Sequence, residues 1–148
     1  MNLTWYDWHQ SELTTQRLYG ILALRNAVFI IEQTCLYQDV DGQDLLDGNR
    51  HVAGYLGDSL MAYARILATG DRLVIGRVII APPARGLGLG HQLMERALTA
   101  CDAHWPGRGI TLSAQAHLQD FYRQFGFAAV TDIYDEDGIM HIGMSNRP

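Results

Sequence analysis

A segment rich in β-branched residues, Leu73–Ala81, stops at two consecutive prolines and is followed by a glycine-rich turn. Proline neither donates a ladder hydrogen bond nor continues a strand easily, so we expect a strand that ends before Pro82. Apolar residues recur at helical spacing from Gly88 to about His104, and the apolar segment Ile110–Ala114 indicates another strand. Two strands joined through a helix predict a parallel pair with a crossover connection.

Shorter patterns predict the remaining elements. Leu3–Trp8 alternates apolar and polar residues, as a half-buried strand does, and a helix over about residues 13–30 carries its apolar side chains on one stripe. Residues 31–49 are irregular and acidic, and periodicity leaves open whether they contain a short second helix. Three further elements are a hairpin of His51–Leu56 and Leu60–Ala68, a helix over about Ala116–Phe125 that stops at Gly126, and a closing hairpin of Phe127–Tyr134 and Ile139–Met144. Hairpins combined with one parallel crossover predict a mixed α/β (α+β) sheet with helices on both faces.

Length, charge and hydropathy limit the class of protein. The chain has 148 residues, of which 48% are apolar, so we expect a single domain over residues 1–148 with one hydrophobic core. The net charge is −5, whereas non-specific nucleic-acid binding needs the opposite sign, so a nucleic acid is disfavoured as a partner. No stretch of about 18 apolar residues occurs, and no basic region precedes an apolar run at the start. The sequence therefore predicts a cytoplasmic protein that has no membrane partner.

The types of basic residue and the cysteines exclude several chemistries. All 11 basic residues are arginine. A chain without lysine cannot form a pyridoxal phosphate Schiff base, and it lacks the phosphate-binding lysine of Walker loops and of kinases. Cys35 and Cys101 are far apart and lack the Cys/His spacing of a zinc site. We therefore expect neither a metal nor a disulfide framework.

The glycine-rich turn is Arg85-Gly86-Leu87-Gly88-Leu89-Gly90, between a strand and a helix. Glycine lets the backbone turn sharply and approach a ligand, and the first N–H groups of a helix are unpaired at the positive end of its dipole. These features predict an anion cradle that suits a pyrophosphate, with Arg85 as a further donor at its rim. The alternative is a tight turn whose glycines only allow close packing of helix on strand. A Rossmann glycine pattern fails at His91.

In two motifs and in its order of elements, the chain resembles the GNAT family of acyl-CoA N-acyltransferases. The first family signature is Arg/Gln-x-x-Gly-x-Gly/Ala after the fourth strand, and residues 85–90 satisfy it. The second is a fifth strand followed by a helix with Tyr-x-x-x-Gly-Phe, which Tyr122, Gly126 and Phe127 provide. A narrower resemblance is to the ElaA-type branch, whose marks here are Arg25-x-x-Val28-Phe29, Glu32-Gln33, Tyr37, residues 39–42, residues 114–119 and residues 136–144.

The resemblance implies a mechanism in which an amine attacks the thioester of bound acetyl-CoA directly, without a covalent enzyme intermediate. It also implies that the fourth and fifth strands of a mostly antiparallel sheet splay apart and that the pantetheine arm lies in the gap. By position the arm pairs with Val78, Ile79 and Ile80, and the pyrophosphate binds the amides of residues 85–90. The family tyrosine matches Tyr122, which would protonate the departing thiolate as general acid; the alternative is a packing aromatic.

Several positions near the expected site depart from the family pattern or have two interpretations. Many members carry asparagine seven residues before the tyrosine, where this chain has Gln115, and His117 either caps its helix or contacts CoA. The segment Leu73–Ala81 has no carboxylate that could act as a base. Glu32 and His141 are therefore the candidate bases, each with a purely structural alternative.

The acceptor is the least constrained part of the prediction. Asp39, Asp41 and Asp44 form either a solvated loop or a group of carboxylates that attracts a cationic amine such as a polyamine. We expect an acetyl-CoA-dependent N-acetyltransferase that acts on a primary amine, as a monomer or a homodimer. Two alternatives stay open: a non-catalytic CoA-binding sensor or interaction module, and a transferase of a longer acyl group.

Overall fold

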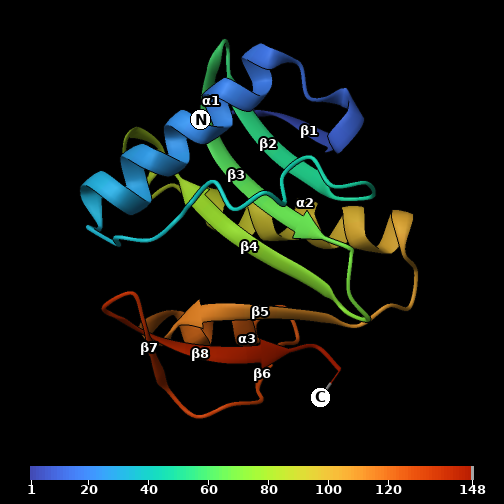
Figure 1. The fold of residues 1–148 in the computed structure, drawn as a ribbon, viewed down its shortest axis with the longest axis vertical. Coiled ribbons are helices and arrows are strands. Elements are labelled where there is room, and N and C mark those ends of the chain that lie inside the picture. The colour runs from blue at the N-terminus through green and yellow to red at the C-terminus, as the bar shows by residue number, and fades with distance from the viewer. Residues whose placement is uncertain (148) are drawn as a thin grey trace.

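One eight-stranded sheet runs through the computed structural model, which describes residues 1–147 (Figure 1). Its order across the sheet is β1-β2-β3-β4-β5-β8-β6, and β7 also pairs with β8. The strands are β1 (Thr4–His9), β2 (Arg50–Leu56), β3 (Ser59–Leu67), β4 (Leu73–Ile80), β5 (Ile110–Gln115), β6 (Ala128–Ala129), β7 (Tyr134–Glu136) and β8 (Ile139–Ser145). The first five strands lie where the sequence predicts them.

The pair β4–β5 is parallel, and the other described strand pairs are antiparallel. Only Leu73 with Ile110 and Val74 with Thr111 are paired between β4 and β5. Beyond these residues the two strands diverge, as Figure 1 shows. The helix α2 (Leu89–His104) connects them, which confirms the predicted crossover. The diverging part of each strand has a backbone edge without a neighbouring strand on that side.

Helices cover both faces of the sheet, so the predicted mixed α/β architecture is confirmed. The larger core lies under α2, which contributes buried residues such as Leu93 and Met94. The helix α1 (Thr15–Arg25) lies on the opposite face, where Ile21 belongs to a smaller buried cluster. Side chains along β3 point alternately to the two faces of the sheet. Ala64 therefore packs in the α2 core, and its neighbour Tyr63 packs in the α1 cluster. None of the helices within residues 1–147 is long and apolar enough to span a bilayer.

The predicted helix over residues 13–30 consists of two parts. Thr14 caps α1, because its hydroxyl oxygen accepts from the N–H of Arg17 at 3.2 Å. After Arg25 the chain continues as a π-helix, Asn26–Glu32, two residues beyond the predicted end. Apolar periodicity gives no sign of such a widened turn, because π-helices are rare and keep their apolar residues near one stripe. Residues 33–49 contain no second helix.

Short 3-10 turns flank several elements and divide the predicted helix over Ala116–Phe125. They are η1 (Gln10–Glu12), η3 (Pro82–Ala84) and η4 (Ala116–Leu118). α3 follows η4 and spans only Gln119–Arg123. Gly126 lies just past its end with a φ of 88°, which is the left-handed conformation that a glycine after a helix commonly adopts.

The predicted strand Phe127–Tyr134 is wrong over most of its length. Within this segment only the short β6 and β7 pair with β8. Between them the N–H of Val130 still donates to the carbonyl of Gly143 at 2.8 Å, and the chain then leaves the ladder. There the hydroxyl of Thr131 accepts from the N–H of Gly143 at 2.8 Å and takes the place of a backbone carbonyl. Asp137 and Gly138 close the β7–β8 turn with φ values of 54° and 86°, as a two-residue hairpin turn requires.

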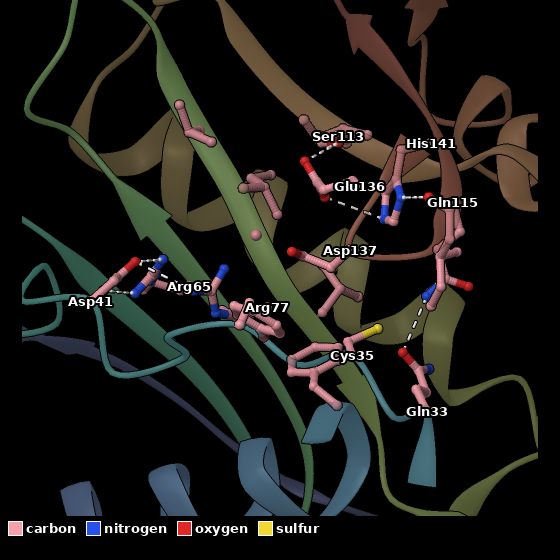
Figure 2. A pocket seen from close by; sticks show the side chains of 18 of the residues that line it. Gln33, Cys35, Asp41, Arg65, Arg77, Ser113, Gln115, Glu136, Asp137 and His141 are labelled. Atoms are coloured by element: carbon pink, nitrogen blue, oxygen red, sulfur yellow. Dashed lines mark hydrogen bonds and ion pairs between the residues drawn. The ribbon is translucent and has the colours of Figure 1, made fainter. Parts of the chain in front are cut away.

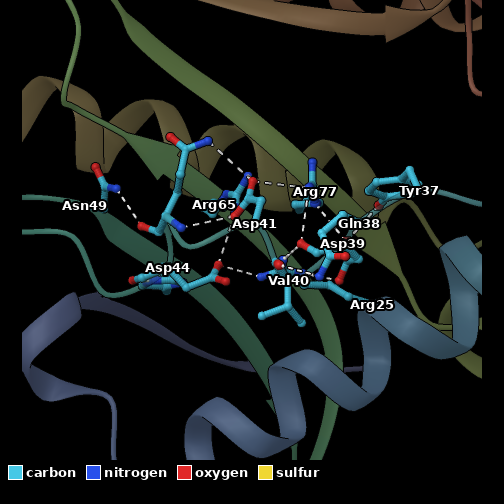
Figure 3. A network of polar contacts seen from close by, with 12 residues as sticks. Arg25, Tyr37, Gln38, Asp39, Val40, Asp41, Asp44, Asn49, Arg65 and Arg77 are labelled. Atoms are coloured by element: carbon cyan, nitrogen blue, oxygen red, sulfur yellow. Dashed lines mark hydrogen bonds and ion pairs between the residues drawn. The ribbon is translucent and has the colours of Figure 1, made fainter.

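The acidic loop is held by buried ion pairs, so the expectation of a solvated loop is wrong (Figure 3). Arg25 of α1 is fully buried and contacts Asp39 at 2.9 Å and Asp44 at 2.6 Å. Arg65 of β3 contacts Asp44 at 3.1 Å and Asp41 at 2.8 Å. The loop is therefore tied by its carboxylates to both the helix and the sheet.

The same arginines lower the pKa values of two carboxyl groups in the loop. Burial alone would raise the pKa of Asp44, but the hydrogen bond from Arg25 and the charges of Arg25 and Arg65 outweigh it and lower that pKa. For Asp41, burial is outweighed by the hydrogen bond and charge of Arg65, and the pKa falls to about 2. Carboxylates with a lowered pKa stabilise the folded state above their unfolded pKa, and this contribution is lost as the pH falls through the folded pKa.

We expect the free energy of unfolding to fall as the pH is lowered from 3.8 to about 2, because Asp41 and Asp44 take up protons there on unfolding. Asp44→Asn should lower the stability at neutral pH by about 3 kcal/mol, since two buried guanidinium groups lose a shared counter-charge. It should also weaken the pH dependence. Urea unfolding across this pH range measures both effects. Asp120→Asn is the control, because its pair with Arg123 is exposed; equal pH dependence in wild type and Asp44→Asn would contradict the expectation.

Candidate active site between β4 and β5

A cavity of about 440 Å³ occupies the gap where β4 and β5 diverge (Figure 2). Its walls come from both faces of the sheet. Leu112 and Tyr122 belong to the core on the α2 side, whereas Ser113 and Gln115 alternate with Leu112 along β5 and point to the other face. The cavity therefore passes through the sheet, and molecules on opposite faces can meet in it.

Tyr122 lines the cavity from α3 and is 6% exposed. Phe121 and Phe127 pack edge-on against its ring. Burial raises the pKa of Tyr122 to about 12, so its phenol stays protonated at neutral pH. Burial is the one cause of this rise in the pKa, and no hydrogen bond within residues 1–147 contributes to it, which leaves the hydroxyl available as a donor.

The glycine-rich turn lies at the start of α2. Gly86 and Gly88 have φ values of 77° and 75°, which other residues adopt at a cost, and α2 begins at Leu89. No side chain caps this helix end, so the first N–H groups of α2 remain available to an anion. Gly90 lies against Phe121 of α3, and a Cβ there would be 3.6 Å from the ring, which is an ordinary van der Waals contact, so packing does not require glycine at this position.

Arg85 and Glu32 are paired with each other at the edge of the site. The two guanidinium Nη atoms contact the carboxylate oxygens at 2.6 and 2.8 Å, and the Nε of Arg85 donates to the carbonyl of Ile80 at 3.0 Å. The hydrogen bond from Arg85 lowers the pKa of Glu32. The pair joins the end of the π-helix to the turn, and Glu32 does not line the cavity.

Several polar side chains of β5, β7 and β8 line the cavity on the face of the sheet away from α2 (Figure 2). The Nδ1 of His141 lies 2.8 Å from the carbonyl of Ile139, and its Nε2 lies 3.4 Å from Glu136. Because a carbonyl only accepts, Nδ1 carries the proton in the neutral ring. Ser113 hydrogen-bonds with Tyr134 and lies 3.4 Å from Glu136, and the Tyr134 ring stacks on His141. His141 is 8% exposed.

Of the other predicted site residues, some line the cavity and some do not. Gln115 lines the cavity and donates to the side chain of Gln33 at 3.3 Å, which links β5 to the segment after the π-helix. Val78 also lines the cavity, but Ile79 and Ile80 do not. His117 is exposed in η4 and lies outside the cavity.

Some cavity residues were not anticipated as parts of a site. Arg77 lies in β4 with a φ of 54°, and its side chain reaches the acidic loop. Cys35 is buried at the wall, where burial and the charge of Asp137 raise the pKa of its thiol. Glu136 and Asp137 stand in the segment that resembles the ElaA branch, which is the only sequence signal that could have pointed to them. Within residues 1–147, no three His, Cys, Asp or Glu side chains lie close enough together to hold a metal ion.

Comparison with known proteins decides the family to which the chain belongs. The family model described as an acetyltransferase (GNAT) domain matches residues 14–147. The chain belongs to the GNAT family. GNAT proteins are acyltransferases, so the cavity between β4 and β5 is the candidate active site of an acyltransferase fold.

The similar GNAT proteins include members of the ElaA branch, which confirms that narrower resemblance. The chain is 53% identical to the protein ElaA of Escherichia coli over 148 residues, which cover 98% of this chain and 97% of that protein. The crystal structure of E. coli ElaA superposes with a TM-score of 0.95 over 99% of this chain and all of the other. An acyl-CoA N-acyltransferase from Pseudomonas aeruginosa is 48% identical with a TM-score of 0.94, over 97% of this chain and 99% of the other.

Proposed function

We propose that the protein is an acetyl-CoA-dependent N-acetyltransferase, which transfers the acetyl group to a primary amine by direct attack. The observation that carries this proposal is the cavity through the sheet between β4 and β5, with Tyr122 at one side and His141 at the other. A thioester and an amine that approach from opposite faces would meet there without a covalent enzyme intermediate. Membership of the GNAT family and the similar N-acyltransferase from P. aeruginosa support the reaction class.

Acetyl-CoA would bind along β4 and at the glycine-rich turn. The pyrophosphate would accept hydrogen bonds from the uncapped N–H groups of residues 86–90. The pantetheine arm would pair with the β4 edge that β5 leaves free, next to Val78. Arg85 would support the turn through its bonds to Ile80 and Glu32 rather than contact the phosphate with its side chain.

Tyr122 would assist the departure of the CoA sulfur. As the amine nitrogen forms its bond to the carbonyl carbon, the C–S bond breaks and its electron pair goes to sulfur. The phenol of Tyr122, protonated because its pKa is about 12, would donate its proton to that thiolate. The lack of a competing hydrogen-bond partner supports this role.

We assign the general base to His141 and not to Glu32. The attacking amine must release a proton, and the Nε2 of His141 is unprotonated in the neutral ring and faces the cavity. After proton uptake the imidazolium can donate to both Ile139 and Glu136, so both oxygens stabilise the charged ring. Glu32 is held by Arg85 with a lowered pKa and is therefore a weak base.

The acceptor is a primary amine in this proposal. The idea that Asp39, Asp41 and Asp44 attract a cationic acceptor has little support, because three arginines, Arg25, Arg65 and Arg77, match their charges. These carboxylates hold the loop in its conformation through their ion pairs.

The proposal is tested with purified protein, acetyl-CoA and a panel of amines, with thiol release as the measurement. Turnover with at least one amine supports it. CoA binding by calorimetry without turnover would favour a sensor, and the absence of CoA binding would exclude both functions. Longer acyl-CoA donors in the same assay define the acyl group.

We expect Tyr122→Phe to lower kcat by about 100-fold with little change in CoA affinity, because only the proton donor is removed. Steady-state kinetics and calorimetry measure the two effects separately. A variant that turns over like the wild type would remove Tyr122 from the role of general acid.

His141→Gln and Glu32→Gln form a matched pair that separates the two candidate bases. His141→Gln should lower kcat by about 100-fold in steady-state kinetics, since the group that takes the amine proton is lost. Glu32→Gln should keep most of kcat, because Glu32 only pairs with Arg85. The opposite result would transfer the base to Glu32.

A further inference from the structure

Arg77 has a backbone conformation that is unusual for a residue with a side chain. Its φ of 54° lies in the left-handed region, in the middle of β4. Residues other than glycine persist there when surrounding contacts hold them, because Cβ comes too close to the neighbouring carbonyl. Such positions gather at functional sites, and Arg77 lines the cavity.

The left-handed residue belongs to a β-bulge. Arg65 pairs with Gly76 and Tyr63 pairs with Ile79, so two residues of β4, Arg77 and Val78, lie opposite one residue of β3. The bulge changes which side chains face α2. Before it these are Leu73 and Ile75, and after it they are Val78 and Ile80. An unbroken strand would keep odd-numbered residues on that face and would turn Val78 away from it.

The side chain of Arg77 is fixed on the opposite face by the acidic loop (Figure 3). Its Nε donates to the carboxylate of Asp39 at 2.8 Å, and Nη2 lies 3.3 Å from the backbone carbonyl of Asp39 and 3.3 Å from Asp41. The guanidinium also lies over the ring of Tyr37, 5.0 Å from its centre. Asp39 is itself anchored by the buried Arg25, so the contacts end on a fixed part of the molecule.

We propose that Arg77 is a positioning residue, whose ion pairs with Asp39 and Asp41 hold the left-handed bulge and so aim the edge of residues 76–78 that β5 leaves unpaired at the acyl-CoA. The inference rests on the proposed function, because it needs a donor in the gap. It adds that the acidic loop influences the binding of acyl-CoA indirectly, through the backbone conformation of β4.

The variants Arg77→Ala and Arg77→Gly test this. Both lose the ion pairs and the contact with Tyr37 to the same extent. They differ in the backbone, since glycine adopts a φ of 54° freely and alanine does not. The kcat/KM for acetyl-CoA should therefore be roughly ten-fold higher in Arg77→Gly than in Arg77→Ala, mostly through KM.

Arg50 provides the matched control. It pairs with Asp7 at 2.8 Å, lies in β2 and does not have a positive φ. In an ordinary strand glycine is worse than alanine, so Arg50→Gly should unfold at a lower temperature than Arg50→Ala. The order should be reversed at residue 77, with Arg77→Gly more stable than Arg77→Ala.

Two results would overturn the inference. One is an equal KM for acetyl-CoA in Arg77→Ala and Arg77→Gly, which would give Arg77 a role through its charge alone. The other is the same order of melting temperatures at residues 77 and 50. If wild-type protein fails to bind CoA, the proposed function fails, and the melting temperatures still decide whether residue 77 keeps the left-handed conformation of the bulge.

Discussion

The parallel ladder of β4 and β5 ends after two residue pairs, and the site depends on this short pairing. Leu73 and Val74 bring the strands together at one end. The α2 crossover then fixes their common direction, and their divergence opens a cavity through the sheet. The glycine-rich turn follows from the same connection, because the chain must leave β4 and begin α2 within a few residues. One topological constraint thus supplies the gap, the free strand edge and the uncapped helix end.

The wall of the site that residues 33–49 form is held in place by ion pairs instead of apolar packing. Residues 33–49 have no helix or strand, and Arg25, Arg65 and Arg77 hold their carboxylates against α1, β3 and β4. Arginine suits this role, because its planar donors bind several oxygens at once and keep their charge when buried. In this chain, which has no lysine, arginines of three elements meet on one loop.

Much of this arrangement can be predicted from the sequence, and the failures share a cause. The crossover, the β2–β3 hairpin and the turn at residues 85–90 depend on local patterns such as β-branched runs, prolines and glycines. The π-helix, the bulge at Arg77 and the broken β6–β7 segment depend on partners far along the chain. Asp39 looks like a solvated residue until its distance to Arg25 is known. Tyr122 and Gln115 were found through family motifs, whereas Glu136 becomes a site residue only beside His141.

The Glu32–Arg85 pair differs in kind from the pairs of the acidic loop. About two fifths of each of its side chains is exposed, whereas Arg25 and Asp44 are almost entirely buried. Dissolved ions screen charges at the surface over about 10 Å at an ionic strength of 0.1 M and act far less on buried ones. Raising the ionic strength therefore loosens the connection between the π-helix and the glycine-rich turn and leaves the acidic loop in place, so the two ends of the site respond to their medium independently.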